Sequence, residues 1–238
     1  MAVSSGPAAV AAGQLAESRE VRQLVTFRFV PGQARAAREI YRRQLMPIYR
    51  SVEAMRQVRA FGEAESPEPL DLVIVTHYAD LAAMDRANNA LEQPAPDRPS
   101  VAFLYSQLAN LSLGHTDQFV EVISPPLSAA PDDTLEVLEF LRLEPGFAEP
   151  FEQQVLAAVH AWEQDDDEVR ALVIRSETAR FLVADGWDYL RTYAIRNLAA
   201  WQAYAAARAR HPAAAAVQRM VAARKTLVLR EVADLRVR

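Results

Sequence analysis

The sequence predicts an α+β fold in which a β-α-β-β-α-β unit occurs twice. The first observation is a stretch found in two copies, at 70–84 and 187–201, each a strand of alternating character that leads into a helix. The second is a Pro-Gly pair after the first strand of each half, Pro31-Gly32 and Pro145-Gly146. The third is the segment 124–133, SPPLSAAPDD, whose prolines are incompatible with a helix or a central strand.

These observations divide the chain into four segments. Residues 1–20 are small and Ala-rich without periodicity, and we expect a disordered tail there. Two ferredoxin-like units follow at 21–123 and 134–238. The segment 124–133 is the predicted linker between them.

In the first unit, strands are expected where β-branched and aromatic residues gather or alternate. These runs are 21–30, 55–65, 70–78 and 118–123. Helices are expected at 33–52, from residue 80 onward, and at 101–113. Pro47 should kink the first helix or end it early, and Tyr41 and Tyr49 are interpreted as packing residues on its apolar face. Asp80 is predicted as an N-cap, because its side-chain oxygen can accept a hydrogen bond from an amide of the first turn.

The second unit repeats this order of elements. Strands are expected at 134–143, within 169–183, at 187–194 and at 226–232. Helices are expected at 147–162, 198–208 and 212–223, with a break at His211-Pro212. Asn197 is predicted to cap its helix as Asp80 does.

Composition excludes several classes of protein. The 238 residues include no Cys, which excludes disulfides, thiolate metal sites and Cys nucleophiles. The formal charge is −5 and no basic stripe with aromatics is present, so no nucleic-acid partner is expected. No window approaches the roughly 18 consecutive apolar residues of a membrane helix, so no membrane partner is expected either. These features favour a cytoplasmic protein, and they leave a homodimer open.

Sequence motifs for common chemistries are missing as well. The chain has no GxSxG, GxxxxGK or GxGxxG pattern. Its four histidines are not spaced as an i, i+4 pair, and no HExxH occurs. We therefore expect neither a metal nor a cofactor.

The chain resembles the dimeric α/β-barrel superfamily in three features. These are the Pro-Gly turns, the Leu-Ala-Ala step from strand to helix at 81–83 and 198–200, and the His211-Pro212 break before an Ala-rich helix. That superfamily includes stress-responsive barrel proteins, antibiotic-biosynthesis monooxygenases, NIPSNAP-type proteins and polyketide cyclases. The resemblance covers 21–238 and implies that two fused units pair their sheets into one barrel. One chain would then close the barrel without a partner.

The resemblance does not carry over every functional residue. Related cyclases use histidines on strands one and three, where this chain has Gln23 and Leu72. Some relatives have a second His after a His-Pro pair, whereas alanines follow Pro212 here. Haem binding, known in other relatives, would need an axial ligand, for which His77 and His211 are the obvious candidates.

The register that the resemblance implies predicts a site inside the barrel. The side chains expected to face the interior from 187–194 are Trp187, Tyr189, Arg191 and Tyr193. Glu139 would face them from 134–143, and Tyr78 would face the barrel from the first unit. Aromatic walls with convergent polar groups are typical of a small-molecule site. In that site Arg191 would hold a carboxylate or phenolate, and Glu139 would act as a base if burial raised its pKa. His77, in contrast, is expected to lie beneath the helices.

Three interpretations follow. The first is a cofactor-independent monooxygenase or cyclase that acts on a small aromatic or polyketide-type molecule in the barrel cavity, with Glu139 and Arg191 as catalytic residues. The second is a barrel that binds a small molecule, or has a stress-related role, without catalysis. The third is a packed barrel in which the Arg and Glu satisfy each other and the aromatic residues only pack. An accessible cavity would separate the first two from the third.

Overall fold

The computed structural model describes residues 19–65, 72–93, 96, 98–124, 134–183 and 186–237. Most of the predicted tail, up to residue 18, lies outside the described residues. The predicted linker from residue 125 to 133 lies outside them too, as does the beginning of the strand predicted at 70–78.

The described strands close into one antiparallel barrel, in the order β1-β3-β2-β8-β5-β7-β6-β4. Their bounds are β1 Val21–Phe29, β2 Met55–Glu65, β3 Leu72–Tyr78, β4 Ser112–Ser124, β5 Leu135–Leu143, β6 Val173–Phe181, β7 Tyr189–Ile195 and β8 Val221–Val237. The first four strands are contiguous in this order, and so are the last four. The pairs β2–β8 and β4–β6 join the two sets.

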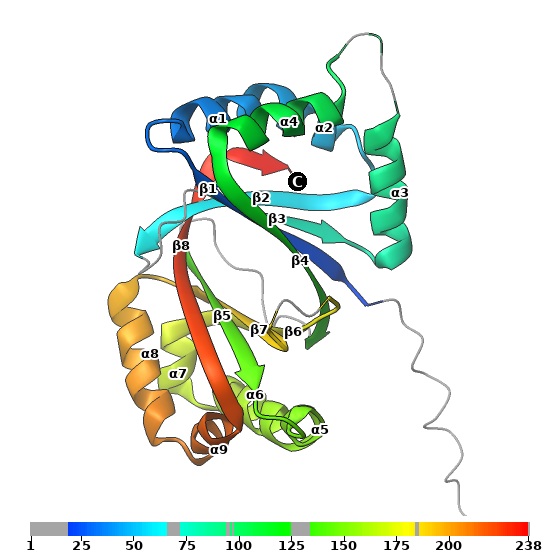
Figure 1. The fold of residues 1–238 in the computed structure, drawn as a ribbon. Coiled ribbons are helices and arrows are strands. Elements are labelled where there is room, and N and C mark those ends of the chain that lie inside the picture. Colours follow the sequence, from blue (N-terminus) through cyan, green and yellow to red (C-terminus); the bar gives the residue numbers. More distant parts are fainter. Residues whose placement is uncertain are drawn as a thin grey trace, which may run out of the picture.

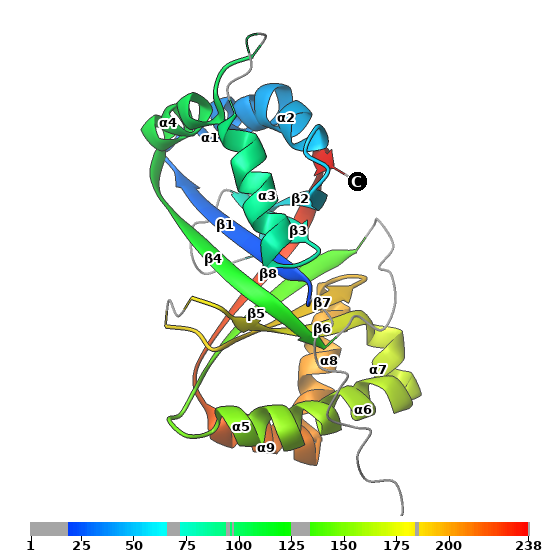
Figure 2. The same cartoon turned by 90° about the vertical axis from the view of Figure 1, so that its right-hand side faces the viewer.

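Two groups of helices pack on the outside of the barrel, on opposite sides of it (Figure 1 and Figure 2). One group packs on the first four strands: α1 Ala34–Ile40, α2 Met46–Arg50, α3 Leu81–Glu92 and α4 Val101–Leu111. The other packs on the last four: α5 Ala148–Pro150, α6 Ala157–Asp165, α7 Asp167–Leu172, α8 Leu198–Arg210 and α9 Pro212–Met220. Within the described residues no helix is long and apolar enough to cross a membrane.

Local signals in the sequence explain several element ends. Asp80 accepts a hydrogen bond from the Ala83 amide at 2.6 Å, and Asn197 accepts one from the Ala200 amide at 2.9 Å, which confirms both predicted N-caps. Gly32 and Gly146 follow the two prolines with φ of 82° and 86°. Only glycine adopts this conformation without strain, which explains both turns.

The first helix does not end at Pro47. The π-helical turn η1 (Tyr41–Leu45) directly precedes Met46 and Pro47, and the helix runs on to Arg50. A π-helical turn η2 (Phe151–Leu156) occupies the corresponding place in the second half, directly after Pro150. A π-turn rearranges the i to i−4 hydrogen bonds, so a helix can continue next to a residue without an amide hydrogen.

Two strands are longer than the sequence predicts. β4 begins at Ser112 rather than at 118, and β8 begins at Val221 rather than at 226. The added residues of β4 are mostly polar and exposed, and they pair with β1. The added residues of β8 favour a helix, but pairing with β5 holds them extended.

The interior of the barrel is packed. Its apolar cluster includes Leu24, Phe61, Val73, Val75, Leu138, Phe140, Leu190 and Leu227. Within β5 and β7 the predicted register is therefore wrong by one residue, which reverses the face of every side chain of these two strands. Glu139, Tyr189, Arg191 and Tyr193 point toward the helices, and Leu138 and Leu190 fill the barrel instead.

The structure also shows which way the side chains of Trp187, Tyr78 and His77 point. Trp187 does pack against the interior cluster, next to Phe140 at 5.8 Å between ring centroids. Tyr78 packs on the helix side of β3 and not in the barrel. His77 shares its face with Val73 and Val75, and that face lines the barrel, so the placement of His77 beneath the helices is wrong.

Candidate functional site

Two cavities lie between the strands and the helices that cover them, one in each half. The first cavity holds about 490 Å³ and is lined by residues of β1, β3, β4 and the helices above them. The second cavity holds about 620 Å³ and is lined by residues of β5, β7, β8 and the helices α6, α8 and α9. Both volumes are in the range of small-molecule sites.

The floor of the first cavity carries a chain of hydrogen bonds across three neighbouring strands. The Tyr78 hydroxyl donates to Gln23 Oε1 at 3.3 Å. Gln23 Nε2 donates to Asp117 Oδ1 at 3.0 Å. The other oxygen of Asp117 lies 3.3 Å from His115 Nε2. The chain therefore ends at an imidazole in the cavity wall.

His115 is held in place from two sides. Asp117 fixes its Nε2 edge, and Phe27 stacks on its ring with centroids 5.7 Å apart and planes at 23°. Its side chain is 50% exposed, so a ligand can reach the ring. A carboxylate that orients an exposed imidazole is an arrangement that suits a general base, because the fixed ring can meet a proton of the ligand.

Three tyrosines form the wall that faces this floor, and they are Tyr41, Tyr49 and Tyr105. The hydroxyls of Tyr49 and Tyr105 lie 2.7 Å apart, joining α2 to α4. Burial raises the pKa of Tyr41 and of Tyr49 well above the usual 10, and Tyr105 charge adds to both shifts. Burial also raises the pKa of Tyr105. These phenols therefore remain protonated at neutral pH and have O–H groups that can donate to a ligand.

The lining of the first cavity suits an uncharged ring system. Apolar side chains complete its walls, among them Val25, Phe27, Ile74, Leu91 and Leu108. Its charged lining groups are the acidic residues Glu92 and Asp117, together with the titratable His115, and no arginine or lysine of the described chain lines it. A flat aromatic molecule with hydroxyl or carbonyl groups fits these walls better than an anion does.

The predicted pair Glu139 and Arg191 lies in the second cavity. The two residues are cross-strand neighbours of β5 and β7. Each has another main partner: Arg191 binds Glu163 at 2.9 Å, and Glu139 accepts two hydrogen bonds of 2.8 Å from Arg208. Burial alone would raise the pKa of Glu139, but the charge and hydrogen bonds of Arg208, followed by Arg224 and Arg191, lower it below its usual value. The raised pKa that the role of base requires is therefore not found.

The predicted aromatic residues do not line one site. Tyr193 stays close to the pair and donates to Glu139 at 3.2 Å. Tyr189 instead packs against Phe151 with tilted rings and donates to Glu152 at 2.7 Å. Trp187 lies against the barrel interior. Tyr78 belongs to the first half, where it joins the floor of the first cavity through Gln23.

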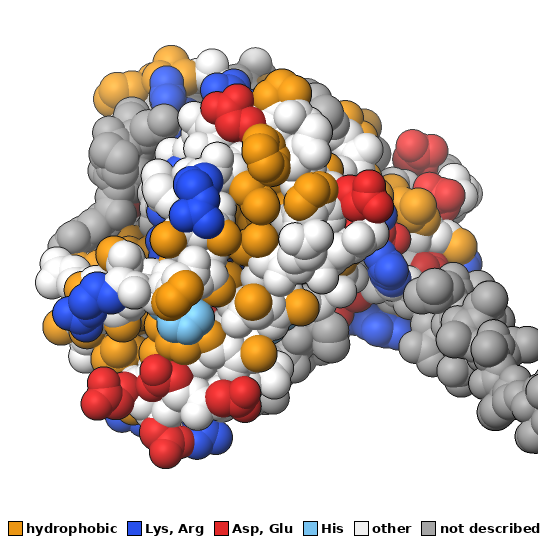
Figure 3. All heavy atoms as spheres, turned by 90° about the horizontal axis from the view of Figure 1, so that it is seen from below, with side chains coloured by type: hydrophobic (Ala, Val, Ile, Leu, Met, Phe, Trp, Pro, Cys, Tyr) orange, Lys and Arg blue, Asp and Glu red, His pale blue; other side chains and the backbone are white. Residues whose placement is uncertain are grey.

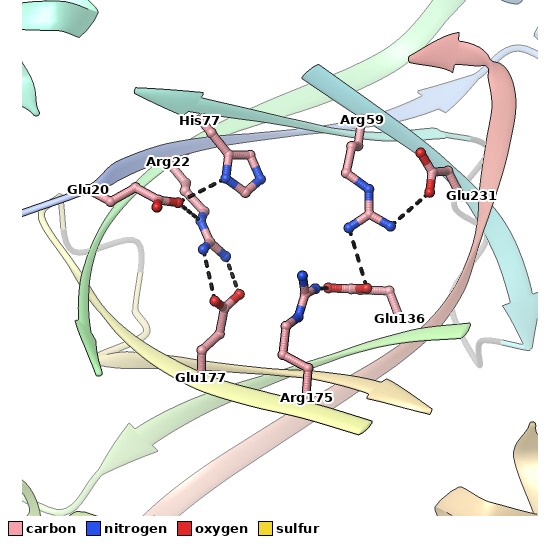
Figure 4. Close-up of polar contacts among 8 residues, drawn as sticks. All are labelled: Glu20, Arg22, Arg59, His77, Glu136, Arg175, Glu177 and Glu231. Carbon is pink, nitrogen blue, oxygen red and sulfur yellow. Dashed lines mark hydrogen bonds and ion pairs between the residues drawn. The ribbon is translucent and has the colours of Figure 1, made fainter. Parts of the chain in front are cut away.

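Ion pairs, rather than a cavity, occupy the polar part of the barrel interior (Figure 4). Arg22 binds Glu177, with one contact at 2.8 Å. Arg59 bridges Glu231 at 2.8 Å and Glu136 at 3.6 Å, and Arg175 also binds Glu136. The space beside them is only about 20 Å³, roughly the size of one water molecule.

The histidines considered as haem ligands do not fit that role. His77 lines this 20 Å³ space and its Nδ1 lies 2.9 Å from Glu20. Burial and the charge of Arg22 lower the pKa of His77 to about 4. His211 caps α9 by accepting from the Ala213 amide, and its ring stacks on Trp162 at 4.5 Å. Among the described residues no group of three or more His, Asp or Glu side chains is arranged to hold a metal ion.

Sequence reasoning missed the floor of the first cavity. His115 and Asp117 are two residues apart, which places both on one face of an extended strand. That spacing was the available signal, but the strand was predicted to begin only at 118. Tyr41 and Tyr49 are buried in the packing of α1 and α2, as predicted, and they also line the cavity.

The fold is shared with solved structures of low sequence identity. A protein from Lactobacillus acidophilus described as a putative monooxygenase aligns over 90% of this chain and 94% of its own, with a TM-score of 0.60 and 9% identity. An anthrone oxidase-like protein aligns over 91% and 92%, with a TM-score of 0.56 and 12% identity. Chlorite dismutase from Candidatus Nitrospira defluvii aligns over 93% and 95%, with a TM-score of 0.58 and 12% identity. No protein-family model and no curated protein sequence matches this chain. These similarities establish the fold and not the activity.

Proposed function

We propose that this protein is a cofactor-independent, monooxygenase-like enzyme that acts on a small aromatic or polyketide-type molecule in the first cavity. The observation that carries this proposal is the hydrogen-bonded chain from Tyr78 through Gln23 and Asp117 to His115. It supplies an oriented base beside a cavity whose walls suit a flat phenolic ring.

In this proposal His115 removes a proton from an acidic CH₂ group that lies between aromatic rings or next to a carbonyl. One hydroxyl of the Tyr49–Tyr105 pair donates to the other, and the proton that stays free stabilises the negative charge that develops on the substrate oxygen. The carbanion is then oxidised by dioxygen, so that a CH₂ group and O₂ give a C=O group and one water. Asp117 holds the imidazole in place.

The descriptions of two structurally similar proteins support the monooxygenase-like part of this proposal. Proteins of the same fold are described as a putative monooxygenase and as anthrone oxidase-like. The proposed site lies between strands and helices, outside the barrel, and Glu139 and Arg191 have no part in it.

The test is oxygen uptake with anthrone as the probe substrate, followed by mass analysis of the product. We expect uptake that depends on the protein, and a loss of about 100-fold in kcat/KM for His115→Gln. Asp117→Asn should lose activity in the same direction. Asp85→Asn, an exposed acid on α3, is the matched control and should keep full activity. The absence of uptake by the native protein with anthrone and with hydroxylated anthrones would refute the oxygenase proposal.

The alternatives are distinct outcomes of the same test. A cyclase would change the substrate by proton transfer without consuming oxygen. A binding protein would retain the probe without change, and the cavity of about 490 Å³ favours this outcome over a packed core.

We also propose that the two halves are copies of one ferredoxin-like unit. Each half begins with a strand and a Pro-Gly turn of positive φ, continues into a π-helical turn, and later has a capped helix after its third strand. The strand orders β4-β1-β3-β2 and β8-β5-β7-β6 also correspond. This proposal explains why one chain closes the barrel.

A further inference from the structure

We infer that the second cavity is a separate binding site for a small organic anion, a carboxylate with an apolar body. The inference does not depend on the proposed function of the first cavity. It rests on the charges, the free hydrogen-bonding capacity and the walls of the second cavity.

Positive charge exceeds negative charge around the second cavity. Arg191, Arg208, Arg219 and Arg224 line it, and Glu139 is its acidic lining residue. Glu163, which binds Arg191 from outside the lining, adds one more negative charge. Four guanidinium groups therefore face two carboxylates, and a bound anion would reduce the imbalance.

The two most exposed arginines of the lining, Arg219 and Arg224, are not fully used by the protein. Glu139 accepts two hydrogen bonds from Arg208 at 2.8 Å, while Arg224 approaches the same carboxylate at only 3.3 Å. The side chain of Arg224 is 29% exposed, and Arg219 is exposed on α9. A ligand carboxylate can take paired hydrogen bonds from such groups.

A buried donor on the floor also lacks a partner. Arg191 is 2% exposed, and its Nε finds no hydrogen-bond partner among the residues that the structure describes. An unpaired buried donor costs free energy, so a ligand or a bound water that reached it would stabilise this site.

The remaining walls are small and apolar. Ala205 and Ala209 come from α8, and Ala214 and Ala215 come from α9. Short side chains leave space between these helices that longer residues would fill. The end of the molecule that carries α5, α6 and α9 shows hydrophobic side chains across its centre, with basic and acidic ones around them (Figure 3). An anion with an apolar ring or chain matches this combination.

The two cavities should therefore select different ligands. The first is lined by acidic and phenolic groups and suits an uncharged molecule, whereas the second presents arginines. Both lie on the helix side of the sheet, in different halves of the chain.

The experiment is isothermal titration calorimetry with sodium 2-naphthoate and sodium octanoate, each compared with its neutral amide. We expect at least one acid to bind with one-to-one stoichiometry and its amide to bind more weakly. Arg224→Gln and Arg219→Gln should each weaken binding of the acid by about tenfold. Arg230→Gln is the matched control, because Arg230 is exposed on β8 and is not part of the cavity lining.

A second pair of variants locates the bound probe. Ala209→Phe fills the second cavity and should abolish binding, whereas Ala109→Phe places the same group in the first cavity and should leave binding unchanged. Because Arg219, Ala209 and Ala109 are exposed, these changes should not unfold the protein. The inference is overturned if neither acid binds, if acid and amide bind equally, or if Ala109→Phe rather than Ala209→Phe removes binding.

Discussion

Arg22 on β1 binds Glu177 on β6 inside the barrel, although β4 lies between these two strands. The side chain of Arg22 is 9% exposed and that of Glu177 is 2% exposed. The Arg22 charge and hydrogen bonds outweigh the effect of burial and lower the pKa of Glu177. The pair therefore connects the first half of the chain to the second through the core.

Arg22→Met should destabilise the fold strongly, because it leaves Glu177 buried without its counter-charge. We expect a loss of about 3–5 kcal/mol in the free energy of unfolding, measured by urea titration. The double variant Arg22→Met/Glu177→Leu should recover much of this loss, since it removes both charges. Arg35→Met, an exposed change on α1, is the control. Equal stability of Arg22→Met and Arg35→Met would show that the pair contributes nothing.

Acid should destabilise the protein through His77. Burial, together with the charge of Arg22, lowers the pKa of His77 from 6.5 to about 4 in the folded state. The unfolded chain therefore binds a proton at this residue between pH 6.5 and 4 that the folded chain does not bind. Stability is full above about pH 6.5 and falls as the pH decreases toward 4, by on the order of 3 kcal/mol.

The measurement is a series of urea titrations between pH 7.5 and pH 4. Replacing His77 by Gln should flatten the dependence in this window, whatever its effect at neutral pH. Burial would raise the pKa of Glu20, but the hydrogen bond with His77 and the charge of Arg22 lower it to about 2. Protonation of Glu20 therefore continues the loss of stability below pH 4.5. An unchanged slope in His77→Gln would contradict this assignment.

Glu163 should be the most sensitive acidic position of the second half. It accepts hydrogen bonds from Arg191, Ser176 and Tyr204 and is 3% exposed. Glu163→Gln leaves the Arg191 guanidinium buried without a counter-charge, and we expect a loss of about 3–5 kcal/mol in thermal or urea unfolding. Glu144→Gln, at an exposed turn, should be neutral and serves as the control.

Tyr78 should act as a positioning residue for the first cavity. Tyr78 is not part of the cavity lining, but its hydroxyl donates to Gln23, which is, so Tyr78→Phe removes one bond of the chain that ends at His115. We expect a decrease of about 3- to 10-fold in kcat with anthrone, since a single neutral hydrogen bond contributes about 1 kcal/mol. Gln23→Leu should have a larger effect on the same rate. A Tyr78→Phe variant that changed only thermal stability would assign this tyrosine to packing.

The sequence predicts the fold better than the site. Strand and helix positions follow from residue type, and the repeated Pro-Gly turns and N-caps identify corresponding places in the two halves. The sequence does not predict which face of β5 and β7 points into the barrel, because both strands are buried on both sides. Leu138 and Glu139 are both below 5% exposed, so alternation of apolar and polar residues does not reveal which one points into the barrel.

The first cavity was missed for a related reason. Its floor joins Tyr78, Gln23 and Asp117 from three strands, which no local pattern connects. His115 lies in a part of β4 whose residues are mostly polar and exposed, so the sequence there does not predict a strand. Pairing with β1 creates this strand, and only the closed barrel brings its side chains to the cavity.

The long last strand has a consequence for how the chain matures during synthesis. β8 pairs with β5 through Val221–Arg230 and with β2 through Val228–Val237, so it seals the barrel between two strands that were made much earlier. Until residues 221–237 leave the ribosome, β2 and β5 each present an open edge that can pair with another nascent chain. We therefore expect this protein to depend on chaperones while it is being translated, and to aggregate when β8 is shortened.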